Sequence, residues 1–144
     1  MTLTRYAFIK AGWHADIVNQ ALVGFTEIIP ASQVEVFDVP GAFEMPLLAR
    51  DLAASGAYGA VAAAALIVDG GIYRHDFVAR AVVEGLMQAG METGVSVLSV
   101  ALTPHHFQET DHHKAIFRDH FVTKGREAAE AALAIGRTRA RLAA

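Results

Sequence analysis

The sequence predicts a three-layer α/β/α fold built around a four-stranded parallel sheet. Two observations support this class. Runs of β-forming or apolar residues alternate four times with helical patterns along the chain, which is the order that produces parallel strands with right-handed crossovers. In addition, the run from Ala60 to Val68 is entirely apolar, as is typical of a central strand covered on both faces.

Each element follows from a local pattern. The first strand is a short buried run at 6–9, and the helix from about Ala15 repeats its apolar residues on one face up to Ile29. Glycine, proline or serine separates the later elements. These are expected as a strand at 34–39, a helix at 44–54, a strand at 60–68, a helix at 76–89, a strand at 95–100 and a helical final third. This order corresponds to a flavodoxin-like arrangement.

Composition limits the functional classes. The 144 residues suit one domain spanning 1–144, and 53% hydrophobic against 19% charged residues suggests a buried subunit interface. A net charge of −3 argues against nucleic acid as a partner, and the absence of cysteine excludes disulfides and thiolate sites. The longest apolar run is under half the ~20 residues of a membrane helix, and the N-terminus lacks signal-peptide order. A cytoplasmic protein that does not enter a membrane is expected.

Two turns at predicted strand ends are suited to a polar ligand. The first, Val39-Pro40-Gly41-Ala42-Phe43-Glu44, leads from a strand directly into a helix. The second, Asp69-Gly70-Gly71, follows the apolar strand and precedes another helix. Glycine permits close backbone approach, and helix N-termini present unpaired N–H groups with partial positive charge. Since ligands of such sheets bind beyond the carboxyl ends of the strands, the two turns predict one composite pocket.

Four side chains near these turns are candidates for chemistry. Trp13, after the first strand, suits stacking on a flat heteroaromatic ring and equally suits a subunit contact. Glu44 in a first helical turn stabilises the dipole and can also accept a hydrogen bond from a ligand hydroxyl. Arg74 opposes the dipole of the next helix, which favours a compensating phosphate. His75 can exchange protons near neutral pH, although a histidine at a helix start is often only a surface residue.

Histidines cluster in the last third of the chain, at 105–106, 112–113 and 120. Adjacent histidines point in different directions on a helix, and no H-x-x-x-H face accompanies a carboxylate. We therefore expect no metal site here, and interpret one or two imidazoles as facing an anionic substrate. Lys124, in Lys124-Gly125, is a further candidate phosphate partner.

The ordered set of motifs resembles the lumazine synthases, over nearly the whole chain. The most specific string is Val39-Pro40-Gly41-Ala42-Phe43-Glu44-Met45-Pro46. The supporting matches, in order and spacing, are the aromatic residue after strand one, the strand ending at Val68, Gly70-Gly71, His75-Asp76-Phe77-Val78, Leu102-Thr103 and Lys124-Gly125-Arg126-Glu127-Ala128-Ala129.

The resemblance implies a cofactor-free condensation of 5-amino-6-(D-ribitylamino)uracil with 3,4-dihydroxy-2-butanone 4-phosphate to 6,7-dimethyl-8-ribityllumazine, a step of riboflavin biosynthesis. Holding two substrates in reacting geometry would supply much of the catalysis. The resemblance assigns Trp13 to the pyrimidine ring; Gly41, Ala42, Phe43 and Glu44 to the ribityl chain; Leu66, Ile67 and Val68 to the uracil edge; and Gly70, Gly71 and Ile72 to the phosphate pocket. It also implies sites between neighbouring subunits of a pentamer, so that Ser99 and His113 face the site of an adjacent chain.

Three positions depart from the family pattern. Arg74 occupies the place of the usual proton-transferring histidine, with His75 next to it. Arginine stays protonated and is a poor base, so His75, a water molecule or the phosphate itself would move the protons. His113 replaces the usual phosphate-binding arginine and would be a weaker, pH-dependent cation. Ser99 replaces a ring-packing phenylalanine. These changes indicate a divergent subgroup.

The changed residues leave a second hypothesis open, a lumazine- or flavin-binding carrier with weak residual catalysis. The segment Phe121-Val122-Thr123-Lys124-Gly125 also lacks the glycine-rich kink of shell-forming members, which favours a pentamer or a pair of pentamers over a large capsid. A phospho-receiver domain is set aside, because Gly12-Trp13-His14 stands where that fold needs an acidic pair.

Overall fold

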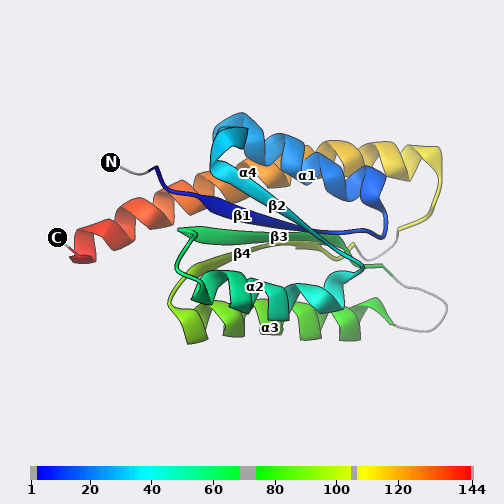
Figure 1. The fold of residues 1–144 in the computed structure, drawn as a ribbon. Helices are drawn as coiled ribbons and strands as arrows, with labels where there is room; N and C mark the ends of the chain where they lie inside the picture. The colour runs from blue at the N-terminus through cyan, green and yellow to red at the C-terminus, as the bar shows by residue number, and fades with distance from the viewer. Residues whose placement is uncertain (1–2, 69–73, 105–106, 144) are drawn as a thin grey trace.

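The protein is a three-layer α/β/α sandwich, seen in a computed structural model that describes residues 3–68, 74–104 and 107–143 (Figure 1). Its four strands are all parallel and lie in the order β2-β1-β3-β4. Their bounds are β1 Tyr6–Ala11, β2 Val34–Val39, β3 Ala60–Leu66 and β4 Ser96–Leu102. The predicted fold class is confirmed.

The helices are divided between the two faces of the sheet. One face is covered by α1 (Ala15–Ile28) and α4 (Asp111–Ala143), and the other by α2 (Met45–Ala54) and α3 (His75–Thr93) (Figure 1). Two short 3-10 turns, η1 (Ala31–Gln33) and η2 (Ala42–Glu44), flank β2. Across the described ranges, no helix combines the length and the apolarity that crossing a bilayer requires.

The sheet separates two hydrophobic cores. Phe8, Phe25 and Phe121 are fully buried on the side of α1 and α4, while Ile9, Met45 and Leu86 are buried on the other side. All seven residues of β3 are buried, as its apolar sequence predicts. Since burial of one large apolar side chain contributes about 1.5–3 kcal/mol, these two layers supply the main driving force for the fold.

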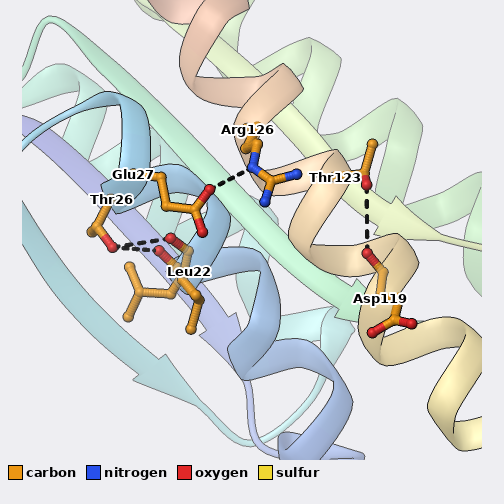
Figure 2. Close-up of polar contacts among 7 residues, drawn as sticks. Leu22, Thr26, Glu27, Asp119, Thr123 and Arg126 are labelled. Atoms are coloured by element: carbon orange, nitrogen blue, oxygen red, sulfur yellow. Dashed lines mark hydrogen bonds and ion pairs between the residues drawn. The ribbon is translucent and has the colours of Figure 1, made fainter.

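Two glycines allow α1 and α4 to cross in backbone contact. A Cβ at Gly24 would lie 1.9 Å from the carbonyl oxygen of Val122, and a Cβ at Gly125 would lie 1.9 Å from that of Ala21. Figure 2 shows the polar border of this crossing, where the guanidinium of Arg126 on α4 donates to the Glu27 carboxylate on α1. Gly125, in the predicted phosphate motif, is therefore required for helix packing.

Several predicted boundaries need correction. The strand expected at 60–68 ends at Leu66, the first strand continues to Ala11, and the strand expected at 95–100 runs from Ser96 to Leu102. The helix expected at 76–89 runs from His75 to Thr93, and Gly94 ends it in the left-handed conformation at φ 72°. Gly90 lies inside that helix and does not end it. Its missing side chain allows close approach to the chain leading into β4, since a Cβ there would lie 3.2 Å from the Val95 carbonyl oxygen.

The helix expected at 44–54 begins differently from the prediction. A 3-10 turn at Ala42–Glu44 precedes α2, which starts at Met45 and carries Pro46 in its first turn. Proline is tolerated there because the first N–H groups of a helix have no intrahelical acceptor. Glu44 therefore lies at the junction of the two helical segments.

Candidate active site at the carboxyl edge of the sheet

Backbone hydrogen bonds tie the strand ends together at one edge. The Gly12 N–H donates to the carbonyl oxygens of Val39 (2.8 Å) and Pro40 (3.2 Å), which joins the turns after β1 and β2. The Ile67 N–H donates to the Leu102 carbonyl oxygen at 2.9 Å, which joins the ends of β3 and β4. Segments from both halves of the chain therefore meet at this edge, where parallel sheets bind ligands.

Trp13 and the Gly41 turn form the centre of the site. A Cβ at Gly41 would lie 3.6 Å from both Cε3 and Cζ3 of the Trp13 indole and 3.7 Å from Glu44 Oε1. Because Gly41 has no side chain, the indole and the carboxylate both lie close to the same stretch of backbone without a Cβ between them. Trp13 is 73% exposed, so its ring is accessible to a planar ligand.

The Glu44 carboxylate is oriented by its own turn. The Gly41 N–H donates to Glu44 Oε1 at 3.2 Å, and the Glu44 N–H donates to the Gly41 carbonyl oxygen at 3.3 Å. The carboxylate bond is one half of a capping box. Glycine has no side chain to supply the other half, so the Glu44 N–H bonds to the backbone carbonyl instead. The carboxylate bond also occupies the Gly41 N–H, one of the groups expected to meet the ribityl chain. Ala42 is part-buried and Phe43 is exposed on the same turn.

The end of β3 supplies backbone to the same edge. Leu66 and Ile67 are buried and Val68 is part-buried. Because the Ile67 N–H already donates to Leu102, this group is not a donor for a uracil edge in this conformation. The expected phosphate pocket at Gly70, Gly71 and Ile72 lies outside the described residues.

Arg74 is the N-cap residue of α3 and His75 is its first residue, as expected. The Arg74 guanidinium pairs with the Asp76 carboxylate at 3.0 Å and lies 4.7 Å from the centroid of the Phe77 ring. Asp76, in the first turn, therefore already compensates the arginine that opposes the helix dipole. The helix dipole alone therefore does not require a phosphate at this position. Arg74 is exposed and accessible to one, and its role as a phosphate partner stays a prediction.

His113 lies in the first turn of α4, where two hydrogen bonds orient it. The Gln108 N–H donates to its Nδ1 at 3.1 Å, and the His113 N–H donates to Thr110 Oγ1 at 3.2 Å. The bond from Gln108 occupies Nδ1, which leaves Nε2 as the ring nitrogen that can meet a ligand. The role of His113 as a phosphate partner stays a prediction.

The other two predicted site residues, Ser99 and Lys124, lie on β4 and α4. Ser99 is exposed on β4, an edge strand, and its Oγ accepts from the Ala101 N–H at 3.3 Å. Lys124 pairs with Glu127 at 3.0 Å on α4. Because Lys124 follows His113 by eleven residues of one continuous helix, the two backbones are about 16 Å apart. The structure therefore does not bring these two candidate phosphate partners together within one chain.

The structure also identifies a residue that sequence reasoning did not select, His14. It is the N-cap of α1 and, among the described residues, the only non-glycine with positive φ (φ 58°, ψ 40°). Its imidazole packs edge-on against Phe107 with ring centroids 5.5 Å apart, and its Nδ1 lies 3.8 Å from Glu109 Oε1. The position after Trp13 was visible in the sequence, but nothing local indicates a left-handed histidine.

An ion pair between α1 and α4 secures the same end of α1. The Arg118 guanidinium on α4 donates to Asp16 Oδ2 at 3.2 Å. Burial would raise the pKa of the Asp16 carboxyl, but the hydrogen bond and charge of Arg118, together with Lys114, lower that pKa below its ordinary value.

Over the part of the chain that the structure describes, no three histidine or carboxylate side chains are grouped to hold a metal ion.

Comparisons with known proteins identify the family of this chain. The sequence model of the 6,7-dimethyl-8-ribityllumazine synthase family matches residues 4–139. The chain is 57% identical over 132 residues to a Rhodococcus erythropolis protein named 6,7-dimethyl-8-ribityllumazine synthase, covering 88% of this chain and 85% of that protein. It is 52% identical over 131 residues to 6,7-dimethyl-8-ribityllumazine synthase 2 of Pseudomonas syringae pv. tomato, covering 88% and 77%. It is 49% identical over 130 residues to the protein of the same name from Bradyrhizobium diazoefficiens, covering 88% and 79%. The chain belongs to the 6,7-dimethyl-8-ribityllumazine synthase family.

Proposed function

We propose that this protein is a transferase of riboflavin biosynthesis that makes 6,7-dimethyl-8-ribityllumazine. Its substrates are 5-amino-6-(D-ribitylamino)uracil and 3,4-dihydroxy-2-butanone 4-phosphate. The observation that carries the proposal is the convergence of Trp13, Gly41 and Glu44 at the carboxyl edge of the sheet, in a chain whose relatives are named as synthases of this product.

The reaction is a condensation followed by elimination and ring closure. The 5-amino group attacks the ketone and water leaves, giving an imine. Inorganic phosphate is then eliminated from the butanone fragment, and the ribitylamino nitrogen closes the second ring with loss of another water. All atoms of the product come from the two substrates, so the proposal includes no cofactor. The protein contributes by holding the substrates in reacting geometry and by moving protons.

The pyrimidine substrate is assigned to Trp13 and the Gly41 turn. The exposed indole stacks on its ring, the Glu44 carboxylate accepts hydrogen bonds from ribityl hydroxyls, and Ala42 and Phe43 border the chain. Backbone groups of Leu66, Ile67 and Val68 meet the uracil edge. Because Gly41 and Ile67 have their N–H groups occupied, recognition there depends on the carboxylate and the carbonyl groups.

The phosphate substrate is assigned to the rim between β3 and α3. Arg74 orients the phosphate and His75 moves the protons, with Gly70, Gly71 and Ile72 bounding the pocket outside the described residues. His113, Ser99 and Lys124 of an adjacent chain complete the site. Lys124 is about three helical turns from His113, so the two contact different parts of the substrates.

A pentamer or a pair of pentamers is the proposed assembly. Val83, Met87 and Met91 recur every fourth residue and form an exposed apolar stripe on α3, with Met87 66% and Met91 78% exposed. Such a stripe is typical of a subunit interface. We further propose one domain over 1–144 and a cytoplasmic location. Light scattering that gives a single chain or about sixty subunits would contradict the assembly.

Lumazine formation is tested by mixing the protein with both substrates and following the product's absorbance. A rate well above the uncatalysed background, with one phosphate released per lumazine, supports the synthase. The carrier hypothesis has no support in the comparisons, since the relatives are named as synthases. Tight binding of the product together with a rate no higher than the uncatalysed background would support the carrier hypothesis instead.

A further inference from the structure

His14 connects two segments that are far apart in sequence but meet at the rim of the site. Its backbone is fixed by α1, since its carbonyl oxygen accepts from the N–H groups of Ile17 (3.0 Å) and Val18 (2.9 Å). Its side chain is fixed by the segment before α4, through the edge-on contact with Phe107 and the approach of Nδ1 to Glu109. His14 thus holds the chain immediately after Trp13 against residues 107–109.

The contacts continue from Phe107 to His113. The Phe107 ring centroid lies 5.3 Å from that of Phe117 and 6.4 Å from that of His113. Gln108, between Phe107 and Glu109, donates its N–H to the His113 imidazole. We call His14, Phe107, Glu109 and His113 the His14 cluster. Phe107 packs against both His14 and His113, and Glu109 lies beside His14, so the positions of Trp13 and His113 are set together.

We propose that His14 is a positioning residue that links two neighbouring active sites. This inference rests on the proposed function, in which Trp13 stacks on the pyrimidine of its own site while His113 serves the phosphate of the adjoining protomer's site. His14 itself contacts neither substrate. Through the His14 cluster it fixes a pyrimidine-binding group of one site and a phosphate-binding group of the next.

The left-handed backbone of His14 makes a clean test possible. Asparagine is the non-glycine residue best suited to that conformation and is also a strong N-cap, so His14→Asn should keep α1 folded while removing the imidazole. Glu109→Gln removes only the carboxylate charge from an exposed position and serves as a milder second variant. Asp16→Asn is the matched control, because it breaks the neighbouring α1–α4 contact to Arg118 without touching the His14 cluster.

Two readouts separate positioning from general stability. The chain has one tryptophan, so its fluorescence reports on Trp13 alone. In His14→Asn we expect a changed Trp13 emission and easier quenching by acrylamide. We also expect KM for both substrates to rise about three- to tenfold, with kcat changed less than twofold. The reason is that the lost aromatic contact orders the groups that bind the substrates. Glu109→Gln should shift KM in the same direction by less, and Asp16→Asn should leave emission and both KM values unchanged.

The inference is overturned if His14→Asn keeps wild-type emission and quenching, if only one of the two KM values rises, or if Asp16→Asn reproduces its effects. Wild-type protein that forms no lumazine would instead refute the proposed function. In that case the emission readout still decides whether His14 positions Trp13, since it requires neither substrate.

Discussion

Gly125 of α4 faces the main chain of Ala21 in α1 so closely that a Cβ at position 125 would lie 1.9 Å from the Ala21 carbonyl oxygen. A clash with backbone cannot be relieved by a rotamer change, so the two helices would have to move apart. Gly125→Ala should therefore destabilise the fold by about 1–3 kcal/mol or more, measured as the free energy of unfolding in urea. Gly136→Ala is the control on the same helix: a Cβ there meets nothing within 4 Å, so helix propensity predicts a gain of up to ~1 kcal/mol. Equal effects of both substitutions would exclude close packing as the role of Gly125.

Trp13 should contribute mainly to the pyrimidine substrate. Trp13→Ala removes the stacking surface beside Gly41 and should raise KM for the ribitylaminouracil about tenfold or more, since stacking of a base on an aromatic ring is worth ~1–3 kcal/mol. Because Trp13 is exposed, the free energy of unfolding should change little. Steady-state kinetics with each substrate varied in turn provides the measurement. An increase confined to the phosphate substrate would show that Trp13 does not stack on the pyrimidine.

Arg74→Ala should weaken the phosphate substrate more than the pyrimidine. Asp76 pairs with the Arg74 guanidinium, but the guanidinium is exposed and has further N–H donors for phosphate oxygens. We expect KM for the phosphate substrate to rise about tenfold or more. Arg80→Ala, which removes another exposed arginine of α3 paired with Glu84, should leave both KM values near wild type. Equal losses for both substrates in Arg74→Ala would remove this residue from the phosphate site.

The hydrogen bond from Gln108 to His113 predicts which substitution at 113 is tolerated. Because Gln108 occupies Nδ1, phosphate would meet Nε2, and a glutamine amide can place an N–H donor there. His113→Gln should therefore retain more affinity for the phosphate substrate than His113→Ala, by about threefold or more. His113→Arg would add charge. A variant series in which Gln behaves like Ala while Arg restores binding would show that a cation, and not a neutral donor, is required.

Tyr58 should give the fold a specific sensitivity to alkaline pH. Its hydroxyl donates to the Glu35 carboxylate, and this hydrogen bond, with burial and the negative charge of Glu35, raises the pKa of Tyr58 above 10.0. A raised folded-state pKa means that the contribution is complete below about pH 10 and is lost as pH rises through the folded value. The contact is partly exposed, so the loss should stay below ~1 kcal/mol. Urea unfolding at pH 8 and pH 11 should show a larger pH effect for wild type than for Tyr58→Phe; identical pH effects would contradict the assignment.

The sequence by itself determined the fold class, the order of strands and helices, and the family. Apolar periodicity and turn chemistry act over a few residues, so the buried strand β3 and the Pro40-Gly41 turn could be predicted from the sequence alone. The placement of Trp13 beside Gly41 followed from a general rule of parallel sheets. Helix ends were less accurate: Gly90 resembles a terminator but lies inside α3, because its missing side chain accommodates the backbone near Val95.

Only the tertiary structure decided how individual polar groups are used. It showed that Asp76 pairs with Arg74, that the Gln108 N–H occupies Nδ1 of His113, and that Gly125 serves helix packing. It also revealed His14 against Phe107 and Glu109, about ninety positions further along the chain. These relationships depend on distances between atoms that the path of the whole backbone brings together. Local sequence patterns specify that a helix or turn forms, but which distant group it meets is set by packing.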